Sequence, residues 1–80
     1  MKYVYLIRSL SVADQRYVGV TSNLDQRLRT HNAGASPHRS KYAPWELVTY
    51  VGFIDEHRAI EFERYPKSGS GHAFARKHLW

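Results

Sequence analysis

Three short runs of aromatic and branched side chains are separated by polar stretches along this chain. Residues 2–8 (KYVYLIR) and 16–21 (RYVGVT) are typical of β-strands, and the polar segment between them predicts a hairpin. Residues 46–53 (ELVTYVGF) predict a third strand. Because side chains alternate between the two faces of a strand, aligning the valine faces of the hairpin places Tyr5 and Tyr17 side by side.

The segment after the second strand predicts an amphipathic helix. Residues 22–25 (SNLD) have the S-x-x-D form of a capping box, which is typical of a helix start. Leu24 and Leu28 are four positions apart and should form a buried stripe. We expect the helix to end near Asn32, with Gly34 as its stop signal.

This predicted helix carries a guanidinium and an imidazole that could take part in binding or catalysis. Arg27 and His31 are also four positions apart, so they should stack on one helix face beside the leucine stripe and point together. Residues 35–44 (ASPHRSKYAP) follow, with two prolines, two serines and three cations. This composition predicts a loop that can face phosphate groups.

A second helix is predicted after the third strand. Asp55 is suited to cap its first turn, and Ala59, Ile60 and Phe62 should face inward in part. Pro66 should end the helix, because the residue before a proline is disfavoured in the helical region.

The last part of the chain predicts a joint and a short helix. Residues 68–71 (SGSG) have the composition of a flexible joint. Residues 72–79 then predict a helix that buries Phe74, Ala75 and Leu79.

These elements together predict an α/β fold. We expect a small, three-stranded, mainly antiparallel sheet flanked by three helices, in the order β-β-α-β-α-α. Residues 1–80 are enough for one small core and should form a single domain.

Composition narrows the possible functions. The chain has no cysteine, which excludes disulfides, thiolate nucleophiles and cysteine-based zinc sites. Twelve Lys and Arg against seven Asp and Glu give a net charge of +5, which favours an anionic partner, nucleic acid first. The apolar stretch at residues 3–7 is far shorter than the ~18 residues of a membrane span, so we expect a cytoplasmic protein with no membrane partner.

Several motifs occur in a specific order along nearly the whole chain. Residues 3–5 (YVY) are followed by residues 17–19 (YVG), and Arg27 comes eight residues after that second tripeptide. Residues 59–63 (AIEFE) are then followed by Lys67. This order and spacing resemble the GIY-YIG nuclease domain family, of which the chain looks like a small stand-alone member.

Two positions depart from the family's pattern. Tyr3 stands where the first tripeptide normally has glycine, although Tyr5 keeps its place. Pro66 precedes Lys67 where an aliphatic residue is more usual, so we expect Lys67 to leave the helix.

The resemblance implies a divalent-metal-dependent endonuclease that cleaves phosphodiester bonds. The catalytic residues that it implies are Tyr5, Tyr17, Arg27, His31 and Glu63. Glu63 would hold Mg²⁺ or Mn²⁺, because one carboxylate together with substrate phosphate is sufficient for magnesium. The alternative for Glu63 is a solvated helix residue that is paired with Lys67 or neutralised by Arg64.

The resemblance also implies roles for the remaining groups. Arg27 would bind the scissile phosphate, the alternative being an exposed arginine that is paired with Asp25 or left free. Tyr17 would activate the attacking water, with Tyr5 orienting water or phosphate. Ionising a free phenol at neutral pH costs roughly 4 kcal/mol unless cations lie nearby. An unperturbed imidazole titrates at about 6.5, so His31 is also a candidate base or proton relay.

The aromatic residues and His31 also have possible structural roles that involve no catalysis. Aromatic packing across strands would explain a tyrosine without any chemistry, and we expect it for Tyr3 and Tyr50. His31 has the alternative of contacting carbonyl groups at the helix end. Trp45 is expected to pack on the sheet.

The expected substrate is DNA, branched or nicked. The residues expected to bind it are Arg27, Arg39, Lys41 and Lys67. A chain of this size has little surface left for reading bases, which favours recognition of DNA structure or a protein partner that supplies targeting. The rival functions are a DNA-binding module without catalysis and a protein-interaction domain that uses the aromatic residues.

Overall fold

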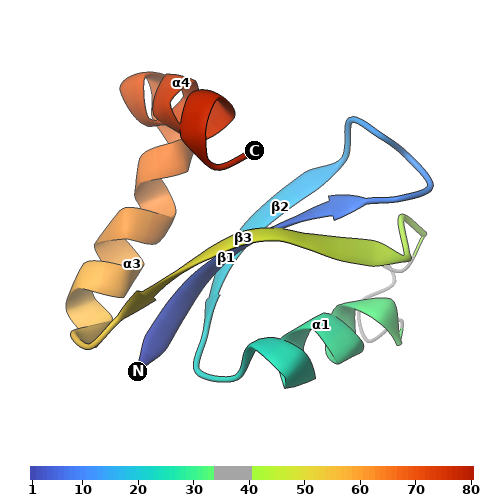
Figure 1. Cartoon of the computed structure of the whole chain (residues 1–80), viewed down its shortest axis with the longest axis horizontal. Helices are drawn as coiled ribbons and strands as arrows, with labels where there is room; N and C mark the ends of the chain where they lie inside the picture. Colours follow the sequence, from blue (N-terminus) through green and yellow to red (C-terminus); the bar gives the residue numbers. More distant parts are fainter. Residues whose placement is uncertain (34–40) are drawn as a thin grey trace.

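The computed structural model describes residues 1–33 and 41–80 of the chain. Its elements are β1 (Lys2–Ser9), β2 (Arg16–Thr21), α1 (Leu24–Asn32), β3 (Trp45–Phe53), α3 (Glu56–Arg64), the 3-10 turn η1 (Tyr65–Lys67) and α4 (Gly69–His78). The predicted α/β fold and its β-β-α-β-α-α order are confirmed (Figure 1).

The sheet has the order β2-β1-β3, and both pairings are antiparallel. In the hairpin Val4 pairs with Val20 and Leu6 with Val18, so the valine faces align as predicted. The central position of β1 explains its composition, because a strand covered on both faces can bury nearly every side chain. Val4 and Leu6 have no exposed surface.

The two faces of the sheet carry separate hydrophobic clusters. The first, under α3, consists of Val4, Leu6, Val18 and Ala59. The second, under α1, consists of Tyr5, Ile7 and Trp45. α3 and α1 therefore lie on opposite faces of the sheet, with β2 as an open edge strand (Figure 1). A site that uses both helices has to be built around that edge.

The start of α1 differs from the prediction by one residue. Asn23, and not Ser22, is the N-cap, and its Oδ1 accepts a hydrogen bond of 3.0 Å from the backbone nitrogen of Gln26. Thr21 fixes the cap in turn, because its Oγ1 accepts a 3.1 Å hydrogen bond from the Asn23 nitrogen. Asn favours the cap position as strongly as Ser, so the sequence alone did not separate the two.

The end of α1 is tied to the start of β3. Asn32 Oδ1 accepts a 2.6 Å hydrogen bond from the Trp45 nitrogen, and Asn32 Nδ2 donates to the Trp45 carbonyl at 3.3 Å. Trp45 itself is buried against the sheet, as expected. The predicted stop at Gly34 and most of the predicted loop at residues 35–44 lie outside the described residues.

The start and end of α3 agree with the prediction, and its inward face agrees only in part. Asp55 is the N-cap, its Oδ1 accepting a 2.9 Å hydrogen bond from the His57 nitrogen. The helix ends at Arg64, and Pro66 lies in the following 3-10 turn. Ile60 is 40% exposed, because the inward face is centred on the fully buried Ala59.

Residues 68–71 are not a flexible joint. Ser68 is the N-cap of α4, with its Oγ accepting a 3.3 Å hydrogen bond from the Gly71 nitrogen, and residues 69–71 form the first helical turn. Gly71 and Ala75 are buried and four positions apart, so they define the inward face. Phe74 falls beside that face and is 41% exposed, contrary to the prediction, whereas Leu79 packs against the core.

Gly71 is required where α4 crosses the preceding turn. A Cβ built on Gly71 would lie 1.7 Å from the backbone oxygen of Tyr65, which cannot move without unwinding η1. Gly71→Ala should therefore destabilise the fold by about 2–3 kcal/mol, as overpacking does. Gly69→Ala is the matched control, because nothing lies within 4 Å of its built Cβ. Thermal unfolding of both variants tests this, and equal melting temperatures would contradict it.

Within residues 1–33 and 41–80, no helix has both the length and the apolar character needed to cross a membrane.

Candidate active site

Two phenols and an imidazole form a cluster between the sheet and α1. The ring centroids are 6.1 Å apart for Tyr5 and Tyr17, 5.9 Å for Tyr5 and His31, and 5.3 Å for Tyr17 and His31. The Tyr5 hydroxyl lies 3.0 Å from His31 Nε2, within hydrogen-bonding distance. Tyr5 and His31 are buried, and Tyr17 is half-buried. The prediction that the two phenols lie side by side is confirmed.

The position of His31 follows from the inward face of α1. Leu24, Leu28 and His31 are spaced i, i+4 and i+7, so they share the stripe that packs on the sheet. His31 therefore lies on the leucine stripe and not beside it, which corrects the sequence-based prediction. The hydrogen bonds between Asn32 and the Trp45 backbone hold this end of the helix in place.

Gly19 is a site residue that the sequence reasoning treated only as part of a motif. It pairs with Tyr5 across the hairpin, and the Tyr5 and Tyr17 rings both lie over it. A Cβ built on Gly19 would lie 2.5 Å from the Tyr5 hydroxyl oxygen and 2.9 Å from Cε2 of Tyr17. The usable signal was a glycine inside a strand, which often marks a close approach of another group.

Gly19→Ala should separate the two phenols. Tyr5 is buried and close to His31, so it cannot swing away from the added methyl group without disrupting the cluster. We expect a loss of about 1–3 kcal/mol. That loss lowers the melting temperature by roughly 5–20 °C and should change the near-ultraviolet circular dichroism of the tyrosines.

Gly52→Ala on β3 is the control for this substitution. Its built Cβ meets only the flexible Met1 Sδ below 3.0 Å, so the side chain can move aside. If Gly19→Ala melted like Gly52→Ala with an unchanged tyrosine spectrum, the proposed crowding over Gly19 would be wrong.

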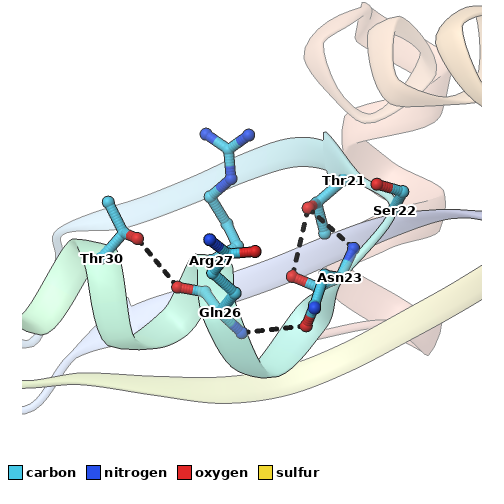
Figure 2. A pocket seen from close by; sticks show the side chains of 6 residues that line it. All are labelled: Thr21, Ser22, Asn23, Gln26, Arg27 and Thr30. Atoms are coloured by element: carbon cyan, nitrogen blue, oxygen red, sulfur yellow. Dashed lines mark hydrogen bonds between the residues drawn. The ribbon is translucent and has the colours of Figure 1, made fainter.

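Arg27 lies one turn before His31 but in a different environment. It is exposed and lines a hollow of about 340 Å³, where it is the charged residue among the described lining residues. The other lining residues are Thr21, Ser22, Asn23, Gln26 and Thr30. Figure 2 shows the guanidinium extending away from the capping hydrogen bond between Asn23 and Gln26. Arg27 and His31 were predicted to point together, but only His31 is buried against the sheet, whereas Arg27 is exposed.

Glu63 lies on α3, over the opposite face of the sheet from α1. Its side chain is 19% exposed and forms an ion pair with Lys67, whose side chain is 55% exposed. Lys67 lies in η1, so it has left the helix as expected. The pairing expected for a solvated helix glutamate is thus present in this structure.

One groove connects the two sides of the molecule. Tyr17 on β2 and Lys67 in η1 both line a groove of about 280 Å³. Lys67 is in turn the ion-pair partner of Glu63. The phenol cluster and the Glu63 carboxylate lie on opposite faces of the sheet, and the groove along the edge of β2 is the surface that links them.

The other predicted residues have these positions. Tyr3 and Tyr50 pack edge to face across the strands with centroids 5.8 Å apart, as expected. Lys41 is exposed, with its Nζ 5.2 Å from the Tyr42 ring centroid. Arg39 lies outside the described residues.

Few side chains near the candidate site could bind a metal ion. Within the described part of the chain, no group of three or more His, Cys, Asp or Glu gathers to hold a metal ion. Glu63 thus offers a single carboxylate, which fits magnesium only together with substrate phosphate and water. Its ion pair with Lys67 would have to open, and the Lys67 side chain, which is 55% exposed, can turn toward solvent.

An antiparallel three-stranded sheet with helices on both faces and paired tyrosines on the face covered by α1 defines a small α/β domain with a polar aromatic site. Residues 1–75 match the GIY-YIG catalytic domain family, and the chain belongs to this family. Nucleases of this family generally depend on a divalent metal ion.

Curated relatives are described as structure-specific endonuclease subunit SLX1 or its homologues. A Giardia intestinalis protein is 35% identical over 65 residues, covering 76% of this chain and 18% of its own length. A Candida glabrata protein is 39% identical, covering 74% and 21%, and a Drosophila mojavensis protein is 41% identical, covering 75% and 23%. The chain therefore spans about a fifth of the length of these relatives.

Proposed function

We propose that this chain is a divalent-metal-dependent endonuclease that hydrolyses phosphodiester bonds in DNA and selects the structure of the DNA more than its sequence. The observation that carries the proposal is the contact of Tyr5, Tyr17 and His31 within a chain of the GIY-YIG family. The net charge of +5 supports a polyanionic substrate. Residues 1–80 would act as one catalytic module.

Tyr17 is the better placed of the two candidate bases. A general base has to come within hydrogen-bonding reach of the water that it deprotonates. Tyr17 is half-buried and lines the groove at the edge of β2, whereas His31 is buried. Tyr17 would therefore take the proton from the attacking water. Tyr5 and His31, 3.0 Å apart, would orient the Tyr17 ring and relay the proton.

Arg27 would hold the scissile phosphate. Its guanidinium is exposed and lies in a hollow whose other described lining residues are uncharged and polar, and a guanidinium offers a planar fork of donors to a phosphate. A fork of donors in this position would stabilise the negative charge that develops on the phosphate oxygens.

Glu63 would hold the metal ion. When bound, a magnesium or manganese ion would supply Lewis-acid stabilisation of the departing oxygen. Glu63 is the residue that would anchor it, with the substrate phosphate as a further ligand. Release of Glu63 from Lys67 leaves the Lys67 ammonium available to the DNA backbone.

The proposal extends to wider DNA contacts and to targeting by a partner. Arg39, Lys41 and Lys67 would neutralise backbone phosphates on either side of the cleaved bond. The relatives carry the word subunit in their names, which supports a protein partner that directs this small module to its substrate. We also propose a cytoplasmic location.

The proposal is tested by a nicking assay on supercoiled plasmid and on branched duplexes. Magnesium or manganese should produce cleavage that is faster on branched than on linear DNA and that stops when EDTA is added. No cleavage of any of these substrates with either ion would contradict the catalytic function.

A DNA-binding module without catalysis is the second candidate, and one observation favours it. The Glu63 carboxylate is already paired with Lys67, as in an ordinary surface ion pair. This function predicts DNA binding whose log affinity falls by about 0.9 per phosphate contact for each tenfold rise in salt. It also predicts no metal-dependent product in the same nicking assay.

A further inference from the structure

The groove at the edge of β2 is lined by several residues to which the proposed mechanism gives no role. Apart from Tyr17 and Lys67, it is lined by Arg16, Val18, Pro66, His72 and Trp80, and among the described residues that line it none has an acidic side chain. Arg16, Lys67 and His72 are exposed, so the groove presents one permanent cation, one ammonium and one imidazole to solvent. Such a surface favours an anion.

The guanidinium of Arg16 stacks on an aromatic ring. Its guanidinium carbon lies 4.9 Å from the centroid of the Trp80 ring. Trp80 packs against the α3-side core, and its backbone nitrogen donates a 2.8 Å hydrogen bond to the Ala75 carbonyl. A guanidinium stacked on a fixed ring keeps its edge donors free, which is the arrangement suited to phosphate.

The cross-strand partner of Arg16 makes an anionic ligand more favourable. Arg16 lies directly opposite Arg8 in the hairpin, and like charges in this position are destabilising. Arg8 is neutralised by Glu46, with Nε and Oε2 2.8 Å apart. Within residues 1–33 and 41–80, Arg16 has no ion pair, so its charge is left for a ligand.

We propose that this groove binds a backbone phosphate of the DNA strand next to the scissile one, with Arg16 as the phosphate ligand and Trp80 as the residue that positions it. The proposal rests on the nuclease function, because the groove begins at Tyr17 and a strand held there would continue along it. A volume of about 280 Å³ suits a single nucleotide unit and is too small for a duplex. Lys67, the ion-pair partner of Glu63, and His72 would line its far wall.

The test is DNA binding measured by fluorescence anisotropy in EDTA, so that it does not depend on cleavage. Arg16→Gln replaces the guanidinium by a shorter, neutral planar amide, so it removes the positive charge and the fork of donors. It should weaken binding about tenfold and lower the slope of log affinity against log salt by about 0.9. Arg76→Gln is the control, since Arg76 is exposed on α4 and does not line the groove. Equal effects of the two variants would overturn the proposal.

Neutral methylphosphonate groups locate the phosphate. Each backbone phosphate of a labelled branched duplex is replaced in turn, and binding is compared between the wild type and Arg16→Gln. One position should weaken binding of the wild type and leave Arg16→Gln unaffected. If every position affects both proteins equally, Arg16 does not bind a phosphate. Coupling at one position in a protein that never cleaves DNA would leave the subsite standing and reject the nuclease.

The positioning role of Trp80 needs its own variants. Trp80→Leu keeps apolar bulk against the core but removes the ring, and it should weaken binding severalfold while leaving the salt slope near that of the wild type. Trp80→Phe should restore most of the affinity, because it again offers an aromatic face. Melting temperatures confirm that both variants are folded. Wild-type affinity for Trp80→Leu would overturn the positioning role.

Discussion

Glu63→Gln should reduce metal-dependent cleavage by roughly a thousandfold. The loss expected for a residue that anchors a catalytic metal is several kcal/mol. About 4 kcal/mol corresponds to that factor in rate. Glutamine keeps the shape of the side chain and can still accept a hydrogen bond from Lys67 Nζ, so the environment of α3 is retained. Single-turnover nicking of branched DNA in magnesium gives the rate directly.

Two controls separate the loss of the metal anchor from an effect on folding and from the loss of a negative charge on α3. The Glu63 side chain is 19% exposed and that of Lys67 55%, and glutamine keeps an acceptor for the Lys67 ammonium, so the substitution should change stability by about 1 kcal/mol. Glu61→Gln is the matched control on the same helix, because the Glu61 side chain is 69% exposed and faces His57. A wild-type rate for Glu63→Gln, or an equal loss for Glu61→Gln, would reject Glu63 as the metal anchor.

The regular elements could be predicted because their sequence signals are local. Alternation in residues 2–8 and 16–21 and the cap at Asp55 each depend on a few neighbouring residues, and the structure has all three features. The error at residues 68–71 arose because glycine and serine also occur at helix starts. The close approach of Gly71 to Tyr65 is a tertiary contact that no local pattern contains.

The candidate site was predictable as a set of residues but not as an arrangement. Hairpin register brings Tyr5 and Tyr17 together, and this could be derived from alternation alone. The burial of His31 depends on which side of α1 faces the sheet, and the pairing of Glu63 depends on where η1 places Lys67. Arg16 and Trp80 are 64 positions apart in the chain, so their contact required the complete fold.

Tyr17→Phe should lower the cleavage rate by about 10²–10⁴-fold, the range expected for loss of a general base. The substitution removes only the hydroxyl group. The phenyl ring keeps its contacts with Tyr5 and His31, whose centroids lie 6.1 Å and 5.3 Å away, so the cluster should remain in place. Affinity for DNA measured in EDTA should change little, which separates a loss of chemistry from a loss of binding.

Comparison with other variants shows which residue is the general base that deprotonates the attacking water. Tyr3→Phe is the control, because Tyr3 packs on Tyr50 outside the cluster and should keep the wild-type rate. Tyr5→Phe removes the hydroxyl that lies 3.0 Å from His31 Nε2, and we expect about a tenfold loss, as for one neutral hydrogen bond. If Tyr17→Phe cleaved as fast as Tyr3→Phe while His31→Gln were inactive, the imidazole would be the base. The half-buried phenol at the edge of β2 would then serve only to pack the ring cluster.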